Sequence, residues 1–311
     1  MSADPHKSKA IEHEAAASGC SDLARSEKDY IDNMERTFAA VGDLYAKYWG
    51  EFFHFALFEK GDEEWEEAFH RTHQQYIEAL RIEKAAKVLD LACGRGGFTD
   101  LLAQSTEGSV LGIDISRSQL SHCRRFRRPN LRFKHHDIMK IDELGETYDA
   151  IALLDADCYL PNKELAVRKI ASIMRPGGRL LLLSWCKKEG LRQVQEELVL
   201  HPFMRYWGIP SLETEQKYRS HFAESALKIV DVAGLNEKVR RNWEFGYEQA
   251  LQGIQNFTTG SALRLLWKGI ELGPDGLRLI KEQFPAAVYI KVGFDTGFLR
   301  YVYFLVEKEL S

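Results

Sequence analysis

The sequence has few cysteines, and their spacing matches neither a disulfide framework nor a structural metal site. There are five in 311 residues, with no Cys-x-x-Cys pair: Cys20, Cys93, Cys123, Cys158 and Cys186. Small disulfide-rich domains and structural zinc sites need paired, closely spaced cysteines. The sequence therefore argues against both classes, and we expect the protein to reside in a reducing cytoplasm.

Long hydrophobic runs and an excess of one charge are also absent. No run of about 18 apolar residues occurs, and the N-terminus lacks the apolar core of a signal peptide. Lys and Arg number 42 and Asp and Glu 46, so the net charge of −4 provides no overall attraction to nucleic acid or to an anionic membrane. We expect a small-molecule partner, no nucleic acid and no membrane span. The oligomeric state stays open, a homo-oligomer included.

The most informative stretch is a short apolar strand that ends in an acid and runs into a glycine turn. Val88, Leu89 and Leu91 supply the strand, Asp90 the acid, and Gly94-Arg95-Gly96-Gly97 the turn before a helix. Such glycines allow a tight turn and the close approach of a nucleotide-like ligand to the backbone. A dinucleotide fingerprint would place a third glycine at position 99, where the chain has Thr99.

Acids recur at the ends of the next three predicted strands. Residues 109–114 end in Asp114, residues 131–136 lead to Asp137, and residues 148–154 lead to Asp155. Each acid alone has a simple explanation as a polar strand end or a helix cap. Four of them at successive carboxyl ends, where doubly wound sheets bind ligands, indicate a binding site.

The flanking regions have different patterns. Residues 1–27 lack a sustained apolar period and are predicted to be a disordered tail, and residues 28–80 are predicted to be helices that contribute to the substrate pocket. The core spans 81–189, where strands and helices alternate. Residues 190–284 are predicted to be a helical lid. Residues 285–311 are predicted to be a closing hairpin of strands 287–294 and 298–307.

In combination, these motifs resemble the class I methyltransferases over residues 80–190. The Asp-x-x-Cys-Gly-x-Gly-Gly stretch is similar to the first motif of that family, and Met174-Arg175-Pro176-Gly177-Gly178 to its turn into the fifth strand. The resemblance implies an α/β fold with a doubly wound, mostly parallel, seven-stranded Rossmann-like sheet, a closing antiparallel hairpin and a helical lid. It also implies S-adenosyl-L-methionine as cofactor and S-adenosyl-L-homocysteine as product.

Carried over residue by residue, the resemblance implies a cofactor site. Gly94 and Gly96 would line the methionine moiety, Asp90 would lie near its amine, and Asp114 would bind both ribose hydroxyls. Ile115 would pack on the adenine and Asp137 would accept its exocyclic amine. The same site would include these neighbours: Ala92, Cys93, Ile138 and Asp155.

A finer resemblance points to the sterol C-methyltransferases and related small-molecule enzymes. Residues 48–56, Tyr-Trp-Gly-Glu-Phe-Phe-His-Phe-Ala, look like the aromatic region of that family, and residues 155–161, Asp-Ala-Asp-Cys-Tyr-Leu-Pro, are similar to its Glu-Ala-Thr-Cys-His-Ala-Pro stretch. The second stretch differs at Asp157, Tyr159 and Leu160. The sequence therefore indicates kinship with the wider group that acts on terpenoids and other natural products.

Methyl transfer requires alignment and exclusion of water, so its acid–base residues depend on the acceptor. His54 is the candidate base and Asp155 the second catalytic candidate. Ordinary packing competes with a pocket role for the candidate substrate residues: Tyr48, Trp49, Phe53, Asp157, Tyr159, Trp207 and Trp243. No metal site is predicted, and Mg²⁺ would enter only with a diphosphate substrate.

We therefore expect C-methylation of an isoprenoid or sterol-like alkene, with O- or N-methylation of a natural product as the alternative. The cluster Arg124, Arg125, Arg127 and Arg128 raises an RNA-binding alternative, although a solvated helix face is the simpler explanation. A catalytically silent module that only binds S-adenosylmethionine is another alternative. A nicotinamide oxidoreductase is disfavoured by Thr99.

Overall fold

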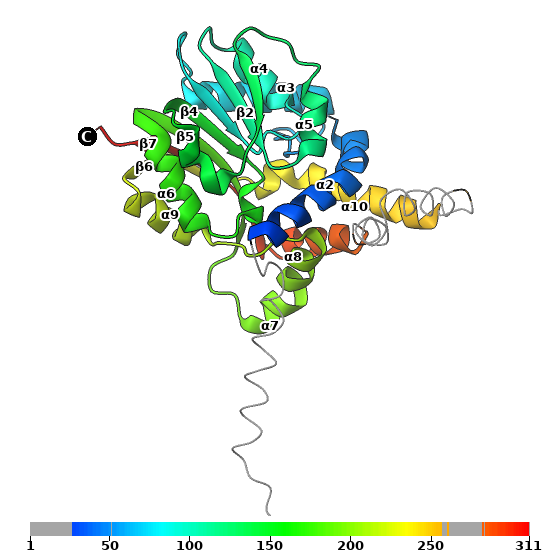
Figure 1. Cartoon of the computed structure of the whole chain (residues 1–311). Coiled ribbons are helices and arrows are strands. Elements are labelled where there is room, and N and C mark those ends of the chain that lie inside the picture. The colour runs from blue at the N-terminus through cyan, green and yellow to red at the C-terminus, as the bar shows by residue number, and fades with distance from the viewer. Residues whose placement is uncertain (1–26, 51, 257–259, 261–281, 283, 311) are drawn as a thin grey trace, which may run out of the picture.

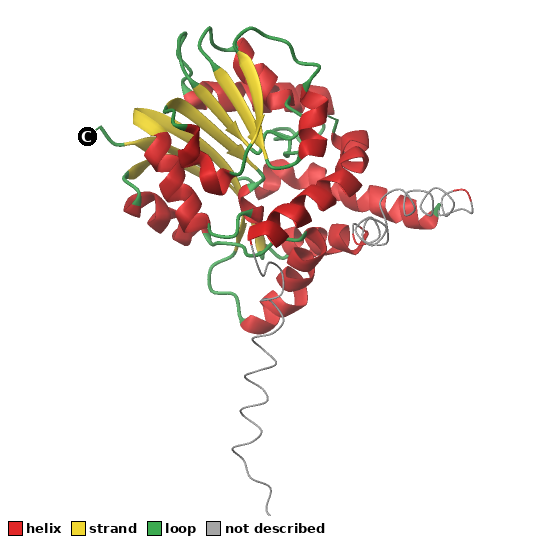
Figure 2. Ribbon diagram, in the orientation of Figure 1, coloured by secondary structure: helices red, strands yellow, loops and turns green. Residues whose placement is uncertain are grey.

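The computed structural model describes residues 27–50, 52–256, 260, 282 and 284–310. The predicted tail therefore lies almost wholly outside the described residues. Within these ranges one sheet runs through the molecule, with helices on both of its faces (Figures 1 and 2). No helix in the described ranges combines the length and apolar character needed to cross a membrane.

The sheet has seven strands in the order β3-β2-β1-β4-β5-β7-β6. Strands β1 to β5 pair in parallel, and β7 pairs antiparallel with both β5 and β6. This arrangement confirms the predicted doubly wound, mostly parallel sheet with an antiparallel end. The strand bounds are β1 Val88–Leu91, β2 Val110–Asp114, β3 Leu131–His135, β4 Tyr148–Leu154, β5 Met174–Lys187, β6 Leu227–Gly234 and β7 Leu299–Lys308.

Alternate residues of each strand bury themselves in two separate cores, as strand geometry requires. Val88 and Ala150 face the core shared with α3 (Trp65–Leu80), α4 (Gly97–Gln104) and α10 (Asn236–Gln255). Leu89 and Ile151 face the core shared with α6 (Lys163–Ile173) and α9 (Glu215–Glu224). The remaining helices are α2 Glu27–Trp49, α5 Arg117–Cys123, α7 Gln193–Gln195, α8 His201–Trp207, and the short turns Ile138–Leu144, Asp157–Tyr159 and Glu196–Leu200.

The prediction of a closing hairpin is wrong in its first strand. Residues 284–295 are helical. The apolar side chains of this segment follow a helical period, because Ala286, Ile290 and Phe294 are buried while Val288 and Val292 are 39% and 38% exposed. The rich supply of β-branched residues there suggested a strand, but the inward stripe packs on aromatic side chains of the neighbouring core.

The antiparallel partner of β7 is instead β6, which lies inside the region predicted to be a helical lid. Its side chains alternate weakly, since the edge position leaves Lys228, Asp231 and several neighbours only partly covered. Residues 190–284 therefore contribute α9 and β6 to the core layers as well as helices to the site. An edge strand of this kind has too few apolar residues to be recognised from its pattern.

Candidate active site

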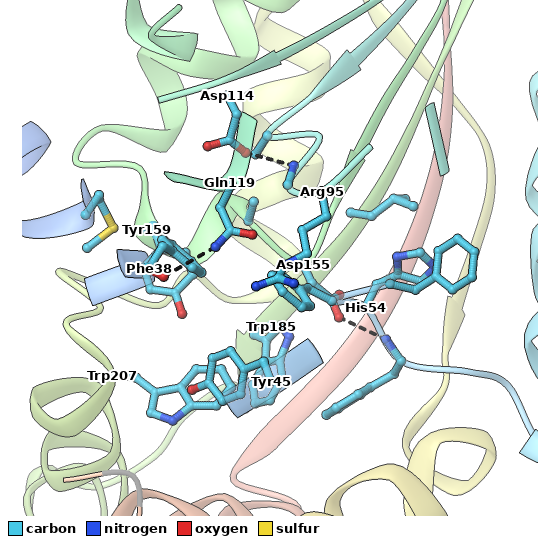
Figure 3. A pocket seen from close by; sticks show the side chains of 18 of the residues that line it. Phe38, Tyr45, His54, Arg95, Asp114, Gln119, Asp155, Tyr159, Trp185 and Trp207 are labelled. Carbon is cyan, nitrogen blue, oxygen red and sulfur yellow. Dashed lines mark hydrogen bonds between the residues drawn. The ribbon is translucent and has the colours of Figure 1, made fainter. Parts of the chain in front are cut away.

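A cavity of about 310 Å³ opens at the carboxyl ends of β1, β2 and β4 (Figure 3). The strand ends contribute its polar wall. Side chains from α2, from Trp207 of α8, from α10 and from the helical residues 284–295 contribute the opposite, mostly apolar wall. The cavity thus lies where ligands bind in doubly wound sheets.

Asp114 ties the glycine turn to the end of β2. Its Oδ2 accepts the Gly94 N–H at 2.8 Å, and its Oδ1 accepts the Ser116 N–H at 2.7 Å. Burial raises the pKa of this carboxyl to about 6, although both backbone donors oppose the shift. The carboxylate is consequently fixed in position at the cavity wall, with lone pairs still available to a ligand.

Asp90 at the end of β1 has a partner that the sequence reasoning overlooked. Thr99 donates its hydroxyl proton to Asp90 Oδ2 over 2.6 Å. Burial raises the Asp90 pKa to about 7, and the nearby Asp114 adds to the shift. In the sequence, Thr99 is noted only because a dinucleotide fingerprint has glycine at that position. In the structure, its hydroxyl holds the Asp90 carboxyl in place. Its position one turn into a helix that starts at the glycine turn is the signal that could have identified it.

Asp137 presents an acceptor that no described residue satisfies. Its Oδ1 caps the following turn by accepting the Met139 N–H at 2.8 Å, while its buried Oδ2 has no hydrogen-bond partner. Ile115 and Ile138 line the cavity beside it. An unsatisfied buried oxygen in a cavity that two isoleucines also line fits the edge of an adenine ring that carries an amine.

The two glycines of the turn have different roles. Gly94 has φ of 54° and lines the cavity together with its neighbours Ala92 and Cys93. Gly96 has φ of 83° and does not line the cavity, and a Cβ at this position would lie 2.8 Å from the Phe133 ring. Gly96 therefore allows the turn to pack closely on β3. The prediction from the sequence was instead that Gly96 lines the methionine moiety of the ligand.

The two catalytic candidates, His54 and Asp155, both line the cavity. Asp155 follows β4 with φ of 58°, a left-handed conformation that is uncommon outside glycine, although aspartate adopts it more readily than most residues. Its Oδ2 accepts the Phe55 N–H at 3.2 Å, which joins it to the residue after His54. Burial raises the Asp155 pKa to about 8, against the opposing effect of Tyr301 and Trp185.

His54 is in contact with a second buried histidine. Its Nε2 lies 2.9 Å from Nε2 of His73 on α3, and the two side chains belong to residues that are 5% and 4% exposed. Burial lowers the pKa of His54 well below its ordinary value and lowers that of His73 to about 4. Both imidazoles are therefore neutral at physiological pH.

Aromatic side chains form the other half of the cavity. Tyr45 lies 6.1 Å, between ring centroids, from both Phe53 and Trp207, and Trp207 lies 5.3 Å from Trp185. Four of the predicted pocket residues line this wall: Phe53, Tyr159, Trp207 and Trp243. Sequence reasoning missed the α2 side chains Tyr30, Met34, Phe38 and Tyr45, although their spacing of four, four and seven marks one helix face.

Of the three other predicted pocket residues, Asp157 is the one whose side chain the structure describes. Asp157 lies outside the cavity lining, where it accepts hydrogen bonds from Ser184 Oγ at 2.6 Å and from the Tyr218 hydroxyl. Its acid is thus used in the core between β5 and α9. Tyr48 and Trp49 belong to α2, and their side chains lie outside the described part of the structure.

Helix α2 is fastened to the cofactor side of the cavity at three points. The Glu35 carboxylate accepts the Arg117 N–H at 2.8 Å at the start of α5. Gln119 Nε2 donates to the Phe38 carbonyl at 3.3 Å (Figure 3), and Arg95 of the glycine turn pairs with Asp43 at 2.5 Å. The N-terminal helix therefore closes over the strand ends.

Comparison with known proteins relates this chain to methyltransferases. Residues 88–178 match the family described as a methyltransferase domain. A sterol 24-C-methyltransferase from Debaryomyces hansenii is 27% identical over 216 residues, which are 65% of this chain and 54% of that protein. Cycloartenol-C-24-methyltransferase 1 from Oryza sativa is 24% identical over 305 residues, or 91% and 87% of the two chains. The chain thus spans only about half the length of the first relative.

Solved structures with the same fold include a mycolic acid cyclopropane synthase complexed with S-adenosylhomocysteine. It has a TM-score of 0.73 at 14% identity and covers 92% of this chain and 100% of its own. A geranyl diphosphate methyltransferase has a TM-score of 0.59 at 15% identity, covering 82% and 98%. At these identities the likeness establishes the fold.

These findings confirm the predicted resemblance: residues 88–178 match a methyltransferase domain, and the chain is similar in sequence and fold to S-adenosylmethionine-dependent methyltransferases. Within that class its sequence stands near the sterol C-methyltransferase group. The cofactor implied by this class is S-adenosylmethionine, and the polar wall of the cavity fits it through the unsatisfied Asp137 oxygen and the backbone-fixed carboxylate of Asp114.

Proposed function

We propose that this protein transfers a methyl group from S-adenosylmethionine to a carbon of a sterol or other isoprenoid alkene. The observation that carries the proposal is the aromatic half of the cavity, which continues without a break from the carboxylates at the strand ends. The relatives named as sterol and cycloartenol C-24-methyltransferases support the same substrate class.

The polar half would hold the cofactor. Asp114 would accept hydrogen bonds from the ribose hydroxyls, and Asp137 would accept one from the adenine amine. Asp90 would lie near the methionine amine. Ile115 and Ile138 would pack on the adenine. When bound, S-adenosylmethionine supplies an electrophilic methyl group on a positively charged sulfur.

The aromatic half suits an alkene acceptor. In this reaction the electron pair of the double bond would form the new carbon–carbon bond as the sulfur–methyl bond breaks and S-adenosylhomocysteine leaves. A positive charge would then remain on the neighbouring carbon. The faces of Tyr45, Trp207 and Trp243 would stabilise that charge, as aromatic rings do for cations. Loss of a proton from an adjacent carbon then restores a double bond, so the site also needs a proton acceptor.

We assign the stabilisation of the positive charge and the acceptance of the proton to different groups. Asp155 would balance positive charge, because a cation beside a buried carboxyl favours its ionised form and opposes the raised pKa. His54 would accept the proton, because it lines the cavity and stays neutral at physiological pH. The cation is so acidic that a weak base is sufficient, and position matters more than basicity.

The lining favours a neutral isoprenoid over a diphosphate. Among the described lining residues, Arg95 is the one arginine or lysine, and its guanidinium is already paired with Asp43. Within the described ranges, no three Asp, Glu, His or Cys side chains are grouped to hold a metal ion. A diphosphate would require several such positive or metal-binding groups.

The test is methyl transfer from S-adenosylmethionine labelled in its methyl group. The purified protein would be incubated with a side-chain-unsaturated sterol, a neutral acyclic isoprenoid alkene, geranyl diphosphate with Mg²⁺, and representative phenol and amine acceptors. We expect label on carbon of a neutral alkene. Labelling of only the phenol, the amine or the diphosphate would overturn the proposal.

A further inference from the structure

His73 lies outside the cavity lining, yet it is the hydrogen-bond partner of the candidate base. It sits on the buried face of α3, and its Nε2 is 2.9 Å from Nε2 of His54. We propose that His73 is a positioning residue that makes His54 a competent proton acceptor, so that the two histidines act as a unit. This inference rests on the proposed C-methylation and extends it.

The geometry restricts which hydrogen atoms the pair can carry. With both rings neutral, only one Nε2 can bear the hydrogen between them, and the other must accept it. When His54 takes a proton, both of its nitrogens bear hydrogen, so its Nε2–H must donate to His73 Nε2. His73 therefore must be the acceptor in the protonated state, with its own hydrogen on Nδ1.

The surroundings hold both rings in place. Phe52 lies 4.2 Å from the His73 ring and 5.7 Å from the His54 ring, between centroids, and Phe98 lies 5.6 Å and 5.8 Å from the same two rings. Such packing fixes the imidazole planes without supplying a competing hydrogen bond. It also makes a lasting charge on the pair unfavourable, so the proton would be passed on after each turnover.

Few other groups act on the charge of the pair. The groups that lower the two pKa values, besides burial, are His73 for His54 and the exposed His70 for His73. The Tyr76 ring lies 6.3 Å from the His54 ring, between centroids. No described carboxylate contributes to either shift, so the pair differs from the carboxylate–histidine arrangement that would favour a charged imidazole.

The proton step is balanced within the proposed reaction. A carbon–hydrogen bond next to the cationic carbon breaks, and its electron pair forms the new double bond. The proton goes to the free nitrogen of His54, whose opposite N–H is held by His73. If His73 cannot accept, protonated His54 loses its buried partner, which raises the free energy of that state.

The test compares three single variants of the full chain. His73→Leu removes the acceptor, His73→Gln restores a carbonyl oxygen at a similar reach, and Gln74→Leu changes an exposed neighbour on the same helix. For His73→Leu we expect a loss of kcat on the labelled alkene of roughly tenfold to hundredfold, since general-base catalysis contributes at least this much. KM and S-adenosylhomocysteine affinity should be unchanged.

His73→Gln should recover most of the lost kcat, and Gln74→Leu should behave as the wild type. Nitrogen-15 NMR of the histidine rings gives a readout independent of turnover: His54 should be neutral in one tautomer in the wild type and lose its Nε2 hydrogen-bond shift in His73→Leu. Thermal unfolding would verify that each variant is folded.

Two results would overturn the inference alone: wild-type kcat in His73→Leu on an alkene that the wild type methylates, or a folded His73→Gln that is as slow as His73→Leu. If the wild type methylates no alkene at all, the proposed function fails and the inference fails with it. The NMR spectra would then still report whether the histidine pair exists.

Discussion

The two halves of the cavity are built in different ways. The cofactor half consists of acids at the ends of consecutive strands, each held by a backbone N–H or a neighbouring hydroxyl, as Asp114 is by Gly94 and Ser116. The acceptor half is assembled from α2, the segment around His54, β5, α8, α10 and the helical residues 284–295, which are far apart along the chain.

This difference implies a difference in tolerance. Substitution of a strand-end acid leaves backbone donors without their acceptor, so it disturbs both the ligand and the loop that binds it. Substitution of one aromatic side chain removes one part of a broad apolar wall. We therefore expect changes in the cofactor half to affect every acceptor, and changes in the acceptor half to affect which acceptor is methylated.

The largest effect should follow from Asp114→Ala. The variant removes the acceptor of the Gly94 and Ser116 N–H groups as well as the proposed ribose contact. Hydrogen bonds to a charged group contribute about 1.5–3 kcal/mol each, so we expect S-adenosylhomocysteine to bind at least about a hundredfold more weakly by calorimetry. Asp142→Ala, which removes a half-exposed surface acid, is the control. Wild-type affinity in Asp114→Ala would contradict the proposed ribose site.

The next effect concerns Asp155 and the pH. Its folded-state pKa of about 8 lies above the ordinary value, as do those of Asp90 and Asp114. The folded protein therefore binds more protons than the unfolded chain between about pH 4 and pH 8, and its stability should fall as the pH rises through this window. Chemical denaturation at pH 5 and pH 8 measures this, and Asp155→Asn should flatten the dependence.

In turnover, Asp155→Asn should lower kcat by roughly tenfold while S-adenosylhomocysteine affinity changes little, since one charge near the reacting atoms is removed and the shape is kept. The wild-type kcat/KM should rise with pH as the free carboxyl ionises, and the variant should lack this rise. An unchanged pH profile in Asp155→Asn would show that another group titrates there.

The same contrast explains what the sequence could predict. The strand-end acids and the glycine turn are local patterns, so the sequence could single out Asp90, Asp114 and Asp137, and all three line the cavity. His73 could not be found, because its contact with His54 depends on how α3 packs. Asp157 follows Asp155 by two residues, yet the short turn after β4 directs it into the core, where Tyr218 and Ser184 hold it.

The helical residues 284–295 show a second limit. Their β-branched residues predict a strand in isolation, but Ile290 and Phe294 bury themselves together against the apolar cavity wall. Phe294 stacks on Trp243 of α10 with 5.7 Å between ring centroids. Tertiary packing thus overrides local propensity, as happens often in strands. For this reason the prediction of a strand over residues 287–294, the first strand of the closing hairpin, is wrong.

A smaller effect is expected in the acceptor half. Trp207→Ala removes a ring that packs on Tyr45, Trp185 and Phe203, so it should lower kcat/KM for a bulky alkene by roughly tenfold through lost apolar contact. Trp207→Phe should retain most of the activity, and cofactor affinity should be unchanged in both. A loss of cofactor affinity in Trp207→Ala would show that the two halves are not separable.

The smallest effect tests where the halves meet. Arg95 belongs to the glycine turn but lies 5.7 Å from the centre of the Phe53 ring, and Asp43 on α2 balances its charge. Asp43 is 69% exposed, so the pair contributes below about 1 kcal/mol. Asp43→Asn removes the negative charge that balances Arg95, whose guanidinium lines the cavity. A cationic ligand should then bind a few-fold more weakly, whereas a neutral one should not.

Calorimetry with S-adenosylmethionine, whose sulfur is charged, and with S-adenosylhomocysteine, whose sulfur is neutral, separates the two cases. Equal weakening of both would instead indicate that α2 has shifted, because a change in charge alone distinguishes them.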